Sequence, residues 1–257
     1  MPRAERPDAS LYYEVHGDGP PLVFAHGAGG NTLIWFQQVP VFARTHRVVT
    51  FDHRGFGRST CAPGAFHARA FADDLRAILD HAGIARAALV CQSMGGWTGL
   101  PAALAFPERV AGLVLSGTPG GVFTPTVAAA FQRVGQLARS EGIRGRPALA
   151  PDFPEREPAL AHLYDQISGL NPPLGGPALA TLAEARVTPA QLAGYTVPTL
   201  MVSGEHDQLF PPAALKEAAA VIPGCRVADF PGTGHSPYFE DAPRFNRLLG
   251  GFLASLS

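Results

Sequence analysis

Short apolar runs, rich in β-branched residues, alternate with helical patterns along most of this chain. The runs LVF, VVTF, AALV and GLVL are apolar on both faces, as strands covered by helices on both sides must be. Such alternation is typical of the α/β class, with a mainly parallel, doubly wound sheet. We expect strands at residues 11–15, 22–25, 47–51, 87–91, 110–115, 199–202 and 226–230.

Helical patterns lie between these runs. We expect helices at residues 70–81, 97–106 and 243–253. The first has an apolar stripe at positions i, i+4, i+7 and i+8 beside an acidic face. The stripe consists of Phe71, Leu75, Ile78 and Leu79.

The strand rhythm stops between residues 119 and 195, where Ala-rich helical patches are split by PDFPEREP and NPPLGGP. Apolar residues at helical spacing occur there at Val127, Ala130, Phe131, Val134 and Leu137. We therefore predict an α/β core of residues 1–118 and 196–257, with a helical lid of residues 119–195 over the ends of the sheet. The apolar content is too high for the alternative, a disordered linker.

The composition favours one large domain that acts on a small molecule. The chain has 257 residues, 46% of them hydrophobic, and a net charge of −1. That balance gives no electrostatic reason to expect binding to nucleic acid or to an anionic membrane surface. The three cysteines, Cys61, Cys91 and Cys225, are odd in number and widely spaced, which argues against a disulfide framework or a zinc site.

The chain shows no targeting or membrane signal of the usual kinds. The first residues lack the apolar stretch of a secretory signal, and no run approaches the roughly 18 apolar residues of a membrane helix. We expect a cytoplasmic protein. One lysine, Lys216, against nineteen arginines suggests a GC-rich bacterial genome.

The segment LVCQSMGGW reads as strand, sharp turn and helix, with Ser93 at the turn. Glycines at 95 and 96 permit the tight backbone of a nucleophile elbow, which pushes the serine oxygen into a pocket. The following helix directs its N-terminal dipole at any anion that forms there. This segment resembles the elbow of the α/β-hydrolase superfamily, except that Cys91 replaces the first glycine of the usual G-x-S-x-G motif.

Two upstream segments extend the resemblance. The strand LVFA runs into HGAGG, residues 26–30, where the superfamily builds half of its oxyanion hole. The resemblance implies the backbone N–H groups of Ala28 and Met94 as donors, and a structural role for His26. The segment FDHRGFGRS is a further hallmark, in which we expect Asp52 and Arg54 to form a structural pair.

Two downstream segments supply the other candidate catalytic residues. Asp207 follows the first strand after the insertion, in PTLMVSGEHDQLFPP, with Glu205 as a close rival. His235 lies in a Gly-rich loop between the last strand and the last helix. The chain order Ser93, Asp207, His235 is that of the α/β-hydrolases and differs from the orders in chymotrypsin and subtilisin.

The resemblance implies a serine hydrolase that cleaves a carboxylic ester or lactone through an acyl-enzyme, with no cofactor and no metal. The substrate would be a small to medium apolar molecule, and the enzyme a monomer or homodimer. Candidate pocket residues are Trp97, Phe123, Phe131 and Leu163. Haloalkane dehalogenases and most epoxide hydrolases of this fold attack with Asp, so Ser93 argues against both.

Alternatives remain open at this level. Carbon–carbon bond hydrolases and perhydrolases of the same fold also have an intact triad. Some relatives are small-ligand receptors that turn over slowly, and a non-catalytic scaffold is disfavoured because all three triad residues are present.

Overall fold

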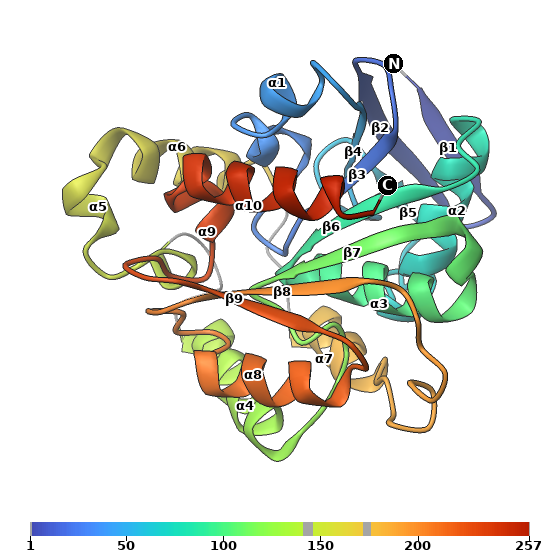
Figure 1. Ribbon diagram of the computed structural model, residues 1–257. Coiled ribbons are helices and arrows are strands. Elements are labelled where there is room, and N and C mark those ends of the chain that lie inside the picture. The colour runs from blue at the N-terminus through green and yellow to red at the C-terminus, as the bar shows by residue number, and fades with distance from the viewer. Residues whose placement is uncertain (1, 141–145, 172–175, 257) are drawn as a thin grey trace.

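The computed structural model describes residues 2–140, 146–171 and 176–256 and contains one sheet with helices on both sides (Figure 1). The strand order is β1-β2-β4-β3-β6-β7-β8-β9, with β5 paired to β2. From β4 to β9 neighbouring strands are parallel, whereas β1, β2 and β5 join antiparallel. The predicted α/β class with a mainly parallel sheet is therefore confirmed.

The strands are β1 (Arg3–Arg6), β2 (Ala9–His16), β3 (Pro21–Ala25), β4 (Arg47–Phe51), β5 (Thr60–Cys61), β6 (Ala87–Gln92), β7 (Val110–Ser116), β8 (Thr199–Gly204) and β9 (Arg226–Phe230). The α-helices are α1 (Val39–Phe42), α2 (Phe71–His81), α3 (Gly96–Ala105), α4 (Pro125–Ser140), α5 (Phe153–Arg156), α6 (Pro158–Gly169), α7 (Gly176–Glu184), α8 (Pro212–Val221), α9 (Pro237–Glu240) and α10 (Ala242–Ala254). Short 3₁₀ helices are η1 (Thr32–Trp35), η2 (Ala68–Ala70), η3 (Ser93–Gly95), η4 (Pro107–Arg109) and η5 (Arg146–Ala148).

The central strands are buried on both faces. Every residue of β6 and of β8 is buried, which explains why both contain runs of consecutive apolar residues rather than an alternating pattern. The register aligns Ala25 with Cys91, Cys91 with Leu115, and Leu115 with Met201. The carboxyl ends of β3, β6, β7 and β8 therefore lie at one edge of the sheet, where the loops that follow them meet.

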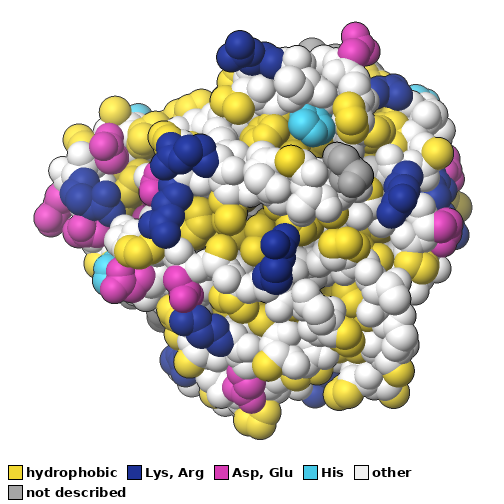
Figure 2. Space-filling view, in the orientation of Figure 1, with side chains coloured by type: hydrophobic (Ala, Val, Ile, Leu, Met, Phe, Trp, Pro, Cys, Tyr) yellow, Lys and Arg dark blue, Asp and Glu magenta, His cyan; other side chains and the backbone are white. Residues whose placement is uncertain are grey.

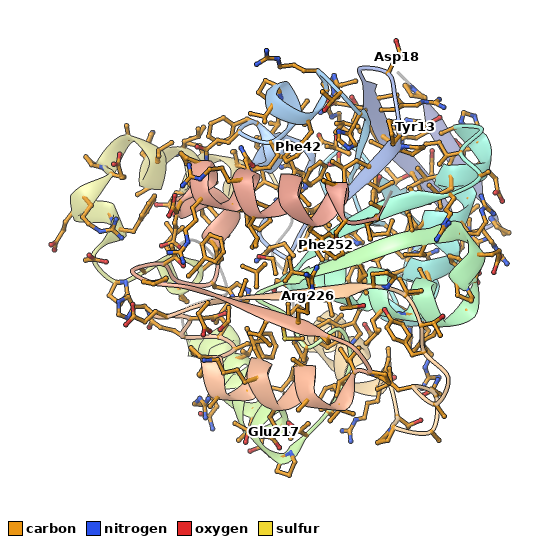
Figure 3. The ribbon with its side chains drawn as sticks, in the orientation of Figure 1. Tyr13, Asp18, Phe42, Glu217, Arg226 and Phe252 are labelled. Atoms are coloured by element: carbon orange, nitrogen blue, oxygen red, sulfur yellow. The ribbon has the colours of Figure 1, made fainter. Side chains whose placement is uncertain are left out.

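Two hydrophobic clusters cover the two faces. The first contains apolar side chains of α2, α3 and α8, and the second contains those of α1, α9 and α10. On the second side, the guanidinium carbon of Arg226 on β9 lies 5.8 Å from the ring centroid of Phe252 on α10 (Figure 3). Figure 1 shows α10 on one side of the sheet and α8 on the other.

The insertion between β7 and β8 is divided between these two sides. Side chains of α4 and α7, including Val127 and Leu182, belong to the first cluster. Side chains of α5 and α6, including Phe153 and Tyr164, belong to the second. Figure 1 shows α4 and α7 near α8, and α5 and α6 near α9 and α10. The described part of the predicted lid, residues 119–195, contains helices α4, α5, α6 and α7 and non-helical segments such as residues 119–124 and 185–195, and its two halves pack on different sides of the sheet. Residues 141–145 and 172–175, and the side chain of Leu137, lie outside the description.

The expected pair of Asp52 and Arg54 does not form. Asp52 instead accepts hydrogen bonds from the backbone N–H groups of Thr32, at 2.7 Å, and Arg58, at 2.8 Å. Buried Arg54 turns the other way and forms a bidentate pair with Asp74 on α2, with both distances 2.7 Å. The prediction was wrong because proximity along the chain does not determine which way each side chain leaves the turn.

The molecular surface mixes side chains of different character. Figure 2 shows one face on which Lys and Arg side chains are distributed among hydrophobic ones. Among the described residues, no helix is both long enough and apolar enough to cross a membrane.

Candidate active site

Ser93 lies at the turn between β6 and α3, as the first residue of η3. Its φ angle is 49°, and it is the one non-glycine residue with positive φ in the described part of the chain. This left-handed conformation is unfavourable for a residue with a Cβ and persists where the surroundings enforce it. The Ser93 side chain is half-buried and borders a cavity.

Close backbone contacts explain the glycines around this turn. A Cβ at Gly95 would overlap the carbonyl oxygen of Ala25 at the end of β3. A Cβ at Gly27 would lie 2.9 Å from the Cβ of Ser93. The loop after β3 and the turn after β6 therefore approach each other more closely than any larger residue would permit.

Asp207 and His235 are in direct contact. Oδ2 of Asp207 accepts a hydrogen bond from Nδ1 of His235 at 2.8 Å, and both side chains are buried. Oδ1 of Asp207 accepts the backbone N–H groups of Leu209 and Phe210, at 2.8 and 2.9 Å. The carboxylate is thus fixed from two sides. Its bond to Nδ1 favours the imidazole tautomer whose Nε2 can accept a proton.

The second ring nitrogen of His235, Nε2, is available to accept a proton. Its Nε2 is buried and has no hydrogen-bond partner among the described residues. The carbonyl oxygen of His235 accepts a hydrogen bond of 3.4 Å from the side chain of Gln92, the residue before Ser93. This contact ties the His235 loop to the turn that carries Ser93.

Glu205, the rival of Asp207, has a different role. It is exposed, and its Oε2 accepts the backbone N–H of Gly232 at 2.8 Å. Its hydrogen bond therefore braces the start of the loop that carries His235.

The loop after β3 is braced by His26. Its Nε2 accepts the backbone N–H of His53 at 3.0 Å, while Nδ1 donates to the carbonyl oxygen of Gly27 at 2.7 Å. Burial lowers the pKa of His26 below its usual value, so the ring is held neutral and serves as both acceptor and donor. The structural role expected for His26 is confirmed by these bonds. Ala28 from this loop and Met94 from η3 both border the cavity at Ser93.

The cavity at Ser93 has a volume of about 30 Å³. Its walls are apolar apart from Ser93 and come from both the core and the insertion. They consist of Ala28, Met94, Trp97, Phe131, Val134, Leu182, Leu209 and Phe210. Two of the four candidate pocket residues, Trp97 and Phe131, are among them, with ring centroids 5.8 Å apart.

The other two candidates lie elsewhere. Phe123 packs against Phe131, with centroids 5.3 Å apart, but it lines a separate cavity of about 490 Å³ between α4 and α7. Leu163 is on α6 and packs against the second core cluster, so its assignment to the pocket is corrected. The reason is that the insertion divides between the two sides of the sheet.

The sequence reasoning missed several wall residues. Leu209 and Phe210 lie two and three residues after Asp207 and donate to it through their backbone N–H groups, so their position near the acid could have identified them. The ring of Phe210 lies 6.1 Å from that of His235. The sequence around Leu182 does not predict its position in the cavity wall, because that position depends on how α7 packs.

Comparisons with known proteins identify the family of this chain. Residues 20–242 match the family model described as alpha/beta hydrolase fold. The chain belongs to the α/β-hydrolase family. As a member of that family with hydrolase relatives, it is an enzyme of the hydrolase class.

Three similar proteins illustrate the range of the family. The "Putative carbamate hydrolase RutD" of Azorhizobium caulinodans is 29% identical over 100% of this chain and 99% of its own length. The 3-oxoadipate enol-lactonase 2 of Acinetobacter baylyi is 32% identical over 78% of this chain and 77% of its own. A solved thermophilic esterase from Thermogutta terrifontis is 27% identical, with a TM-score of 0.82 over 96% of this chain and 94% of that one.

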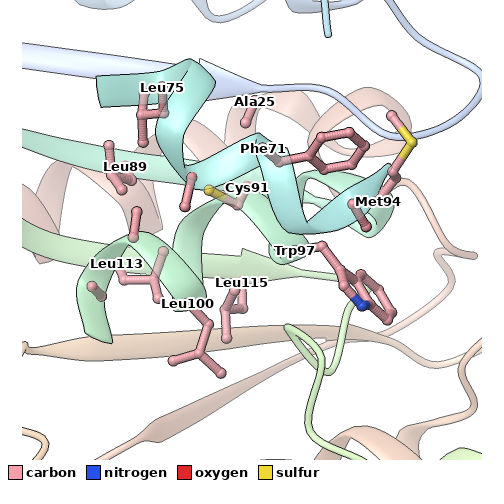
Figure 4. Close-up of a cluster of buried hydrophobic side chains, with 14 of the residues drawn as sticks. Ala25, Phe71, Leu75, Leu89, Cys91, Met94, Trp97, Leu100, Leu113 and Leu115 are labelled. Atoms are coloured by element: carbon pink, nitrogen blue, oxygen red, sulfur yellow. The ribbon is translucent and has the colours of Figure 1, made fainter. Parts of the chain in front are cut away.

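Cys91 replaces the first glycine of the family's usual elbow motif. The missing side chain of Gly99 leaves space for its sulfur. A Cβ on Gly99 would lie 2.5 Å from the Sγ of Cys91 and 2.6 Å from Cδ1 of Leu113. The side chain of Cys91 points into the first core cluster beside Leu89 and Leu113 (Figure 4). Burial raises the pKa of its thiol well above the usual value, so Cys91 packs as a small apolar group rather than as a nucleophile.

We predict that Gly99→Ala destabilises the enzyme by about 1–3 kcal/mol, as overpacking does in a closed core. In the Cys91→Gly background the same substitution should cost less, because the sulfur is gone. Urea unfolding of the four proteins of this cycle measures the coupling. An equal cost of Gly99→Ala in both backgrounds would show that Gly99 does not accommodate Cys91.

Proposed function

We propose that the enzyme cleaves a carboxylic ester or lactone of a small to medium apolar substrate through an acyl-enzyme on Ser93. The proposal rests chiefly on one observation: the buried Asp207–His235 hydrogen bond, which leaves Nε2 of His235 available. The strained turn that exposes Ser93 at the cavity supports the same assignment.

In the proposed reaction, the Oγ of Ser93 attacks the acyl carbon while Nε2 of His235 takes the hydroxyl proton. The oxyanion accepts hydrogen bonds from the N–H groups of Ala28 and Met94, which contribute about 3 kcal/mol each by precedent. His235 then gives its proton to the departing alkoxide, which leaves as the alcohol. Water, deprotonated by His235, attacks the acyl-enzyme; the acid departs and Ser93 regains its proton.

Asp207 has two functions in this scheme. Its bond to Nδ1 keeps Nε2 as the proton acceptor, and its charge stabilises the imidazolium that forms when Ser93 is deprotonated. Leu209 and Phe210 hold the carboxylate in the orientation that both functions need.

The cavity geometry supports an apolar substrate that enters from the side of α4. A volume of about 30 Å³ holds about one water molecule, so substrate binding requires side-chain movement. Phe131 and Val134 line both this cavity and the larger one of about 490 Å³. We propose that Phe131 moves aside and that the larger cavity receives the long part of the substrate.

A carbamate is the second candidate substrate, favoured by similarity along the whole chain to the protein named "Putative carbamate hydrolase RutD". The same residues would act in the same order, with a carbamoyl group in place of the acyl group on Ser93. Esters, lactones and carbamates would therefore use the same catalytic residues and differ in how well the transferred group and the leaving group fit the cavities.

We expect hydrolysis of aryl esters, at a kcat within the usual range of about 1–10³ per second, when esters, lactones and carbamates are assayed side by side. The class with the highest kcat/KM identifies the substrate type. A stoichiometric burst followed by no further turnover on every class would indicate a slow receptor instead of a hydrolase.

We predict that Asp207→Asn lowers kcat by up to about 10⁴-fold, because an amide favours the wrong tautomer of His235. Glu205→Gln is the matched control: it removes a carboxylate two residues away that is exposed and bonded to Gly232. Steady-state kinetics with one aryl ester compares them. A larger loss in Glu205→Gln would contradict the assignment of Asp207 as the acid.

We predict that Phe131→Ala raises the ratio of kcat/KM for octanoate over acetate esters about tenfold, because it opens the wall between the two cavities. Leu163→Ala, in the other half of the insertion, should leave the ratio unchanged. Equal changes for both esters in Phe131→Ala would rule out the larger cavity as the binding site for the chain.

A further inference from the structure

The carboxylate of Glu240 forms hydrogen bonds to the backbone of the loop that carries His235. Oε1 of Glu240, at the end of α9, accepts the backbone N–H groups of Gly234 at 2.9 Å and Ser236 at 3.3 Å. Its Oε2 also contacts the N–H of Gly234, at 3.1 Å. These two N–H groups belong to the residues on either side of His235, so Glu240 holds the backbone of His235 from both directions.

The same carboxylate connects the loop to the insertion. Oε2 of Glu240 accepts the backbone N–H of Ala150, just before α5, at 2.8 Å. A Cβ on Gly234 would overlap the backbone of Leu149 and Ala150, so this segment crosses directly over the loop. Nη2 of Arg156 adds a second connection by donating to the carbonyl oxygen of Gly232 at 3.0 Å.

The opposite side of the loop is equally confined. A Cβ on Gly204, the last residue of β8, would overlap the carbonyl oxygen of Gly234 and lie 2.9 Å from that of Thr233. The loop is therefore enclosed between the end of the sheet and the segment of Leu149 and Ala150. The N–H groups of Gly234 and Ser236 donate to the carboxylate of Glu240.

We propose that Glu240 is a positioning residue that fixes the imidazole of His235 relative to Ser93 and Asp207. This inference rests on the proposed function, in which His235 moves protons. Glu240 touches no reacting atom and acts through the backbone of Gly234 and Ser236. Its hydrogen bond to Ala150 also holds the segment from Leu149 to Arg156 in place. We therefore propose that substrate enters from the side of α4.

Glu240 performs this task as a carboxylate, with two acceptor oxygens facing three N–H donors. Burial raises the pKa of its carboxyl, against the opposing effects of its backbone hydrogen bonds and of Arg156. Of the other titratable groups, Tyr164 on α6 and Tyr238 on α9 interact electrostatically with it, and the His235 ring lies on the loop it holds. Protonation would turn one oxygen into a donor and remove an acceptor from the loop.

The test is Glu240→Gln, which keeps the shape of the side chain but directs an amide NH₂ at one of the N–H donors. We expect kcat to fall about 10- to 100-fold with little change in KM, because misplacement of a catalytic group by about 1 Å can cost 10²-fold. Glu205→Gln is the matched control, since it also removes a carboxylate bonded to this loop, at Gly232. Its kcat should stay within about twofold of wild type, as expected for an exposed contact made three residues before His235.

A pH series separates positioning from a general loss of stability. The ratio of wild-type kcat to that of Glu240→Gln should shrink as the pH falls through the raised pKa of Glu240, because protonation removes the same acceptor from the wild type. A merely structural role gives a ratio that does not depend on pH, and circular dichroism confirms that the compared variants are folded.

The outcomes distinguish this inference from the proposed function. Unchanged kcat in folded Glu240→Gln, while His235→Ala abolishes turnover, overturns the positioning role alone. Full activity in His235→Ala overturns the proposed function and this inference with it. If Glu240→Gln does not fold, Glu240→Asp keeps the charge on a shorter arm and should show the same loss in kcat with unchanged KM.

Discussion

The backbone of Ser93 is held at a φ of 49°, and the rest of the site is arranged around that turn. A serine in this conformation needs surroundings that keep it there. They are supplied by Gly95, which lets the end of β3 approach, and by Gly27, which brings the next loop against Ser93. The same close approach brings Ala28 and Met94 to one cavity. The glycines thus serve the geometry of the site more than the stability of the sheet.

The parallel sheet determines where the other groups lie. Asp207 follows β8 and His235 follows β9, and parallel pairing brings both loops to the edge where β6 ends. Residues 114 and 142 positions from Ser93 along the chain therefore lie in loops at the same edge of the sheet as Ser93. Both halves of the insertion between β7 and β8 then contact the site. Its first half, through Phe131, forms a wall of the cavity, and its second half, through Ala150, supports the His235 loop.

Much of this organisation could be predicted from the sequence, because periodicity and turn residues are local. The seven expected strands were each found, and the pattern of glycines around Ser93 predicted a tight turn. Partners of charged side chains could not be predicted, as the pairing of Arg54 with Asp74 shows. Leu163 was placed wrongly for a related reason: an amphipathic pattern shows that a helix buries one face, but it does not show which side of the sheet the helix covers. Strands β1 and β5 were missed because they are short and partly exposed, so their sequences lack an apolar run.

Covalent attack by Ser93 would leave an acyl group on the enzyme, and trapping of that intermediate tests for the attack. An aryl ester is mixed with enzyme, the reaction is quenched in acid within milliseconds, and the peptides are analysed by mass spectrometry. We expect an acyl group on the peptide that contains Ser93, localised to Ser93 by fragmentation and absent from Ser93→Ala. An acyl group on Cys91 or His235, or ester hydrolysis by Ser93→Ala at the wild-type rate, would contradict it.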